Sequence, residues 1–175
     1  MTTDQVVKPT AFFTRRPVFA PITMLALNRH VLYEYRFLGY EKQKGRNAAV
    51  IEAIPKNREK EQSIYGKIWI DKQDFSILKI EADPRSIKGY TALTELGKKL
   101  KTNLQLSLEI EFENLSNGIR FPTKVSMAEH YKGGRYVSKL KGPGGWLRTR
   151  TVFLYSDYRF FNVNSRVTID DNPGN

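Results

Sequence analysis

Residues 103–114, NLQLSLEIEFEN, alternate strictly between apolar and polar side chains. Leucine, isoleucine or phenylalanine occupies each even position from 104 to 112, and glutamine, serine or glutamate occupies the odd positions from 105 to 113. Successive side chains of a β-strand point to opposite faces, so this segment predicts a strand with one buried and one solvated face. Such a strand requires neighbouring strands and a layer that covers its apolar face.

A second segment, residues 65–84, predicts two strands joined by a polar turn, with apolar side chains on both faces. The expected inward set, which is also the candidate set for contact with an apolar ligand, is Ile68, Ile70, Leu78, Ile80, Leu106, Leu108 and Ile110. On the opposite face of the 65–84 ribbon we expect Tyr65, Trp69, Phe75 and Ile77. Apolar residues on both faces imply that each face is covered, either by protein or by a ligand.

Further strand patterns cover residues 29–57, 119–132 and 147–170, and helical patterns are confined to 21–29 and 89–101. The sequence therefore predicts a mainly β (α+β) fold, with one antiparallel sheet of seven or eight strands in a single domain spanning 1–175. The glycine-rich residues 141–146 predict a flexible connection. Residues 1–16 and 170–175 are expected to be loosely ordered tails.

The residue types indicate a protein that is not an enzyme. The chain has no cysteine, which excludes disulfides and thiolate chemistry, and His30 and His130 have no second histidine at metal-ligand spacing. Glu109, Glu111 and Glu113 share one strand face, which we interpret as a solvated surface rather than a pair of glycosidase carboxylates. We expect neither a metal nor a cofactor.

The chain is basic, with 29 Lys and Arg against 18 Asp and Glu, and no acid occurs between Glu129 and Asp157. The basic residues that we select from this acid-free segment are Lys132, Arg135, Lys139, Lys141 and Arg148. Interleaved with aromatic residues, they suit contact with an anionic lipid surface. Nucleic acid is a weaker alternative because no recognised binding motif accompanies the charge. The plainest alternative is a hairpin tip whose charge keeps it in solution.

Four segments in order resemble one family of known proteins. These segments are FLGYEKQKGRNAAVIEAIPKN, YGKIWIDKQDFSILKIEADP, NGIRFPTKV and YSDYRFFNV. Their succession of G-x-E, G-R-x-A, P-K, G-x-I-W-I-D and F-x-I-x-K-I-E is similar to that of the outer-membrane lipoprotein-sorting proteins, the LolA/LolB-like superfamily with its RseB-type sensor domains. The resemblance extends over residues 29–163.

The resemblance implies a strongly curved antiparallel sheet that forms an incomplete barrel, with one or two helices on its concave face and an acyl-chain cavity between them. It also implies a periplasmic carrier or sensor whose partner is a lipid or an acylated protein, although residues 1–8 lack the pattern of a signal peptide. The strands begin near residue 29, so the family's N-terminal helix and early strands are expected to be missing. The alternative function is a basic module that docks on an anionic membrane, lipopolysaccharide or nucleic acid.

Overall fold

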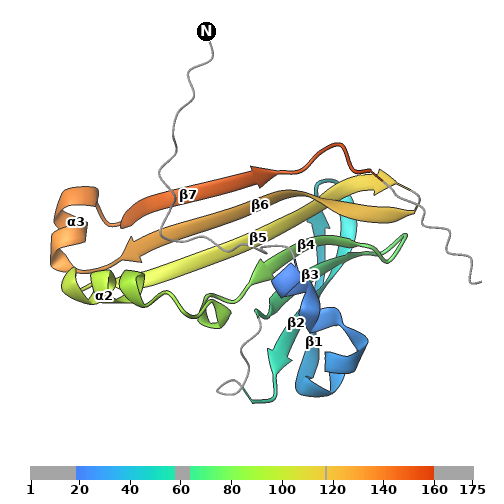
Figure 1. The fold of residues 1–175 in the computed structure, drawn as a ribbon, viewed down its shortest axis with the longest axis horizontal. Helices are drawn as coiled ribbons and strands as arrows, with labels where there is room; N and C mark the ends of the chain where they lie inside the picture. Colours follow the sequence, from blue (N-terminus) through green and yellow to red (C-terminus); the bar gives the residue numbers. More distant parts are fainter. Residues whose placement is uncertain (1–18, 58–63, 117, 160–175) are drawn as a thin grey trace, which may run out of the picture.

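The computed structural model describes residues 19–57, 64–116 and 118–159, and these form a mainly β fold (Figure 1). Seven antiparallel strands make one sheet in the order of the sequence, and the sheet is not closed into a barrel. The strands are β1 Tyr33–Gln43, β2 Arg46–Pro55, β3 Gly66–Asp71, β4 Ile77–Ala82, β5 Asn103–Ser116, β6 Ile119–Lys132 and β7 Trp146–Leu154. Any eighth strand, like both expected tails, lies outside the described residues.

The β1–β2 hairpin shows how local sequence sets the topology. Its two turn residues, Lys44 and Gly45, have φ angles of 48° and 82°. Two positive φ angles in a two-residue turn match the twist of the flanking strands, and glycine adopts this conformation without a steric cost. The expected pair of strands in residues 29–57 is therefore confirmed.

Helical segments are short. They are α1 Phe19–Ile22, α2 Thr91–Lys99 and α3 Arg135–Lys141, with 3-10 turns at Thr23–Leu25, Leu27–Leu32 and Pro84–Ser86. The helix expected over 89–101 is confirmed by α2. The helix expected over 21–29 is broken into turns at Ala26, whose ψ of 131° is extended. The sequence analysis did not predict α3. This helix ends at Lys141, the first residue of the segment 141–146 that was expected to be flexible.

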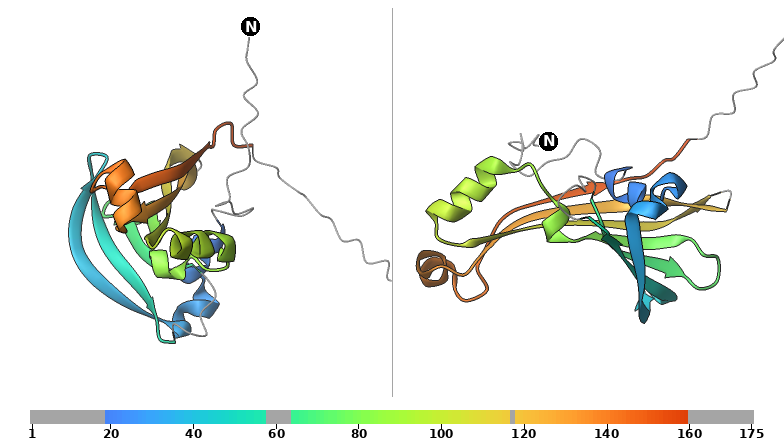
Figure 2. Two further views of the ribbon diagram at one scale, coloured as in Figure 1. Left: turned by 90° about the vertical axis from the view of Figure 1, so that its left-hand side faces the viewer. Right: turned by 90° about the horizontal axis from the view of Figure 1, so that it is seen from below.

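The main core lies on one face of the sheet. A single row of apolar residues crosses six strands through the pairing register, from Ile51 through Ile68, Ile80, Ile110 and Val125 to Phe153. Met24 and Leu93 belong to the same buried cluster as Ile68, Ile80, Ile110 and Val125 of this row. The sheet is curved, and α2 and the N-terminal turns lie on the same side of it (Figure 2). Helical segments therefore cover the face on which the long apolar alternation of β5 is buried.

The predicted inward set is correct for most of its members. The buried ones are Ile68, Ile80, Leu106, Leu108 and Ile110, and Ile70 packs beside them while partly exposed. The prediction is wrong for Leu78, which packs with Trp69 in a separate cluster. Trp69 pairs with Lys79 but Ile70 pairs with Ile77, so a β-bulge leaves Leu78 as an extra residue. A bulge breaks the alternation on which the prediction depended.

The second cluster lies on the outward side of β2, β3 and β4. It consists of Ala48, Val50, Trp69 and Leu78. The indole Nε1 of Trp69 donates to Glu41 at 2.8 Å, and the Lys79 ammonium lies 4.7 Å from the centre of its ring. The stems of long polar side chains can cover apolar surface in this way. Of the other residues expected outward, Tyr65 and Ile77 pack with the main core, and Phe75 is exposed.

A buried carboxylate fixes the β3–β4 turn. Asp71 is 1% exposed and accepts hydrogen bonds from the Arg46 guanidinium and, at 2.8 Å, from the backbone N–H of Gln73. Burial alone would raise the pKa of Asp71, but these hydrogen bonds outweigh it and the pKa lies below its usual value. Arg120 reaches the same turn through Asp74, with its Nη2 2.8 Å from a carboxylate oxygen.

Because its pKa is lowered in the folded state, Asp71 stabilises the fold above its unfolded pKa of about 4, and this stabilisation is lost as the pH falls through the folded pKa. Asp71→Asn is expected to lower the free energy of unfolding by about 1–3 kcal/mol at neutral pH. The difference from wild type should shrink below about pH 4 in urea titrations. Glu34→Gln, at an exposed position of the edge strand, is the control and should follow wild type. A difference for Asp71→Asn that does not change with pH would contradict this role.

Candidate ligand pocket and basic end

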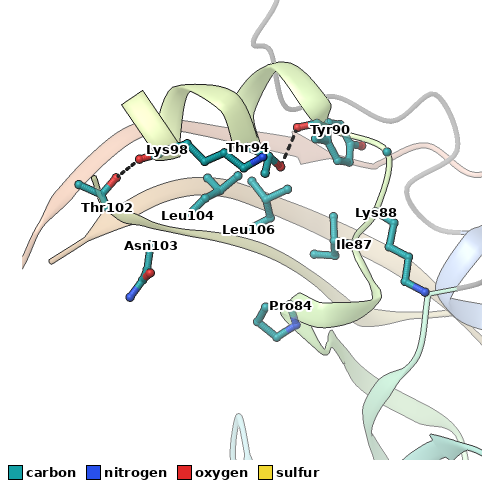
Figure 3. A pocket seen from close by; sticks show the side chains of 12 residues that line it. Pro84, Ile87, Lys88, Tyr90, Thr94, Lys98, Thr102, Asn103, Leu104 and Leu106 are labelled. Atoms are coloured by element: carbon teal, nitrogen blue, oxygen red, sulfur yellow. Dashed lines mark hydrogen bonds between the residues drawn. The ribbon is translucent and has the colours of Figure 1, made fainter. Parts of the chain in front are cut away.

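A pocket of about 500 Å³ lies between α2 and the start of β5 (Figure 3). It is lined by Pro84, Ile87, Lys88, Gly89, Tyr90, Thr94, Gly97, Lys98, Thr102, Asn103, Leu104 and Leu106. Its size falls in the range of small-molecule sites. Leu106 is the one predicted inward residue that lines it. Ile68, Ile80, Leu108 and Ile110 are buried in the main core, Ile70 packs beside that core, and Leu78 belongs to the second cluster.

The pocket combines an apolar wall with a polar rim. Leu104 and Leu106 project from β5, and Ile87 and Tyr90 come from the segment that leads into α2 (Figure 3). The hydroxyl of Thr94, on α2, donates to the Tyr90 carbonyl at 3.2 Å. Such a site suits a ligand with an apolar body and a polar end.

Gly97 lies where α2 packs on β5. It is buried, and a Cβ added there would lie 3.4 Å from the Thr102 carbonyl oxygen and 3.5 Å from the Leu104 Cβ. These are ordinary van der Waals distances, so alanine fits at this position and only a larger side chain would push the helix away from the strand. Glycine lowers helix propensity, and the small residue here keeps this side of α2 free of bulk beside the pocket.

Glu129, on β6, is a fully buried carboxylate that the sequence analysis missed. It accepts hydrogen bonds from the Tyr131 hydroxyl at 2.7 Å, Arg148 Nη1 at 2.8 Å and the Thr149 hydroxyl at 3.0 Å. Burial, together with the hydrogen bond to Glu129, raises the pKa of Tyr131 to about 12. The burial of Glu129 could have been predicted from the sequence, because the alternation of Val125, Met127 and Tyr131 places Glu129 on the same inward face.

Arg148 therefore differs from the other basic residues selected from the sequence. Its ion pair with Glu129 offsets its charge, and the hydrogen bond to that carboxylate raises the pKa of Arg148. Thr149 pairs with Glu129 and Leu147 pairs with His130, so Arg148 occupies a bulge in β7. We assign Arg148 to this buried network and remove it from the group available to an external anion.

The other selected residues, Lys132, Arg135, Lys139 and Lys141, are exposed on or beside α3. The fold places α3 beside the C-terminal end of α2, at one end of the sheet (Figures 1 and 2). Gly134 makes this approach possible, because a Cβ at this position would lie 2.4 Å from the Lys101 carbonyl oxygen. Lys98, Lys99 and Lys101 are thereby brought to the same end, which the sequence alone did not indicate.

Neither histidine belongs to a metal-binding group within the described residues. No group of three or more His, Cys, Asp or Glu among the described residues is arranged to hold a metal ion. His30 Nε2 lies 3.0 Å from the Leu25 carbonyl, and His130 Nε2 lies 3.0 Å from the Gly144 carbonyl. Within the described ranges, no helix has the length and apolar character needed to cross a membrane.

Comparison with protein-family models, curated proteins and solved structures finds no match for this chain.

Proposed function

We propose that the protein is a non-enzymatic carrier or sensor that binds a lipid acyl chain in the pocket between α2 and β5. The observation that carries this proposal is the pocket itself, an open space beside the helix-covered face of the sheet with leucine side chains in its wall. Burial of an acyl chain contributes about 0.8 kcal/mol for each CH2 group removed from water. Affinity therefore requires no catalytic group.

The resemblance to the lipoprotein-sorting superfamily supports the same proposal. In that family the sheet is an incomplete barrel, and helices on its concave face enclose the acyl-chain cavity. Here α2 and the N-terminal turns pack on one side of a curved, open sheet (Figure 2). We extend the proposal to a periplasmic location and to an acylated protein or lipid as the partner on the basis of this resemblance.

A pocket-filling substitution tests the carrier function. Thr94 is exposed on α2 and lines the pocket, so Thr94→Trp should occupy the acyl site without disturbing the core. We expect binding of a fluorescent fatty acid, measured by titration, to weaken at least about tenfold, which corresponds to roughly two buried CH2 groups.

Ala92→Trp is the matched control, because Ala92 is also exposed on α2 but does not line the pocket. Its affinity should remain close to that of wild type. Equal affinity in the Thr94→Trp variant would place the acyl site elsewhere. A wild-type protein, freed of co-purified lipid, that binds no fatty acid or lipopeptide would refute the carrier function.

The second candidate function is docking on a polyanion. Lys132, Arg135, Lys139 and Lys141 are all exposed, and no described acid lies within α3 or the segments that join it to β6 and β7. Binding through these residues should weaken steeply as salt rises, while acyl burial should hardly respond. The salt dependence of each binding activity therefore distinguishes the two functions.

A further inference from the structure

We infer that α2 and α3 together form a docking platform for an anionic lipid bilayer, with the mouth of the acyl pocket at its edge. This inference rests on the carrier function proposed above and names the surface on which the carrier acts. The platform is defined by the exposed residues Lys98, Lys99, Lys101, Lys132, Arg135, Lys139, Leu140 and Lys141.

The charge of the platform selects an anionic partner. Residues 91–102 and 132–146 contain seven basic side chains and a single acid, Glu95. Glu95 is paired with Lys98 at 2.8 Å. Two stretches separated in the sequence by β5 and β6 thus contribute to one basic surface. Clustered lysines near a bilayer add their attractions to its negative surface potential.

Leu140 indicates a bilayer rather than another polyanion. Leu140 is 58% exposed and stands between Lys139 and Lys141 in the sequence of α3, while Val137 of the same helix is buried. An exposed apolar residue flanked by cations matches a lipid interface, where the apolar group enters the acyl boundary and the cations remain among the headgroups. Nucleic acid offers no such apolar layer to a leucine side chain.

The pocket and the platform share one residue. Lys98 lines the pocket and also belongs to the basic surface of α2. A protein docked through α2 and α3 would therefore hold the rim of its pocket near the lipid headgroups. An acyl chain could then pass between bilayer and pocket over a short distance, with its anionic headgroup close to the lysines.

The first test uses co-sedimentation with vesicles of phosphatidylglycerol in phosphatidylcholine. Lys99→Ser combined with Lys101→Ser removes two platform charges that do not line the pocket. We expect vesicle binding to weaken roughly thirtyfold, and fatty-acid binding in solution to stay unchanged. The charge-matched control, Lys42→Ser with Lys67→Ser, removes two exposed lysines of β1 and β3 and should have at most about a twofold effect. Equal losses in the two variants would overturn the platform.

The second test places a fluorescent label in the platform. Because the chain has no cysteine, Leu140→Cys gives a unique site for an environment-sensitive dye. The control is Phe75→Cys, because Phe75 lies at the β3–β4 turn and is 80% exposed. Asp74 in that turn contacts Arg120, near the end of the sheet opposite to α3. On addition of the anionic vesicles, we expect a blue shift for the dye at position 140 and none at position 75.

The outcomes separate the two proposals. Vesicle binding without a blue shift at position 140, or equal binding to single-stranded nucleic acid, would overturn the bilayer platform in favour of general polyanion binding. Fatty-acid uptake without vesicle binding would refute the platform alone. Vesicle binding with a blue shift at position 140 but without fatty-acid uptake would support the platform and refute the carrier function.

Discussion

Replacing Arg148 with methionine is expected to lower the free energy of unfolding by about 2–3 kcal/mol. Among the described residues, the substitution leaves the fully buried Glu129 carboxylate with hydrogen bonds from the Tyr131 and Thr149 hydroxyls and without its cationic donor. Removing one partner from a buried ion pair costs more than removing both, because the remaining charge stays out of water. The expected cost is reduced by the exposure of the Arg148 side chain, which is 34%. Urea denaturation monitored by circular dichroism measures this change in the free energy of unfolding.

A double-mutant cycle separates the ion pair from other effects of the substitution. Arg148→Met combined with Glu129→Leu removes both charges, so the double variant should be less destabilised than the sum of the single variants. Arg150→Met is the matched control, because Arg150 is an exposed neighbour on β7. It should change the free energy of unfolding by at most about 0.5 kcal/mol. Equal effects of Arg148→Met and Arg150→Met would contradict the buried pair.

This pair also bears on function. Because Arg148 forms an ion pair with Glu129, replacing Arg148 should affect folding stability more than docking on vesicles. The exposed Lys139 and Lys141 should show the reverse behaviour. Comparing stability and vesicle binding for these variants therefore separates cations that stabilise the fold from cations that meet an external anion.

Strand patterns in the sequence predicted much of the fold because burial enforces alternation. In β5, a shift of one residue would expose Leu106, Leu108 and Ile110 together, so the buried face follows from the sequence alone. The same reasoning failed at Leu78, where a bulge inserts one residue into β4. A bulge depends on how two strands pair, and pairing is not visible in either strand considered separately.

The candidate site was less predictable because it depends on segments distant in sequence. The pocket requires α2 to pack on β5, and the basic residues at the end of α2 lie beside α3, where Gly134 packs against the Lys101 carbonyl. The sequence marked residues 132–148 as basic, but it did not show that Arg148 faces a buried carboxylate. Charge counts carry no information about which charges are already paired inside the fold.

Gly66→Ala is the second substitution for which we expect a large effect. Gly66 begins β3 and pairs with Ala82 of β4. A Cβ on Gly66 would lie 2.1 Å from the Glu81 carbonyl oxygen and 2.7 Å from the Asp83 backbone nitrogen. Both contacts are with backbone atoms, which cannot rotate away as a side chain would. Overpacking of this kind costs about 1–3 kcal/mol or more, so we expect a loss of about 3 kcal/mol in the free energy of unfolding.

The strain from Gly66→Ala should also reach the pocket. The Asp83 N–H donates to the Tyr65 carbonyl at 2.8 Å, and Pro84, the next residue, lines the pocket. Moving Asp83 away from the new methyl group would displace this wall, so weaker fatty-acid binding should accompany the lower stability. Gly144→Ala is the control, because an added Cβ there meets no atom within 4 Å. Wild-type stability in the Gly66→Ala variant would show that β3 and β4 do not approach each other this closely.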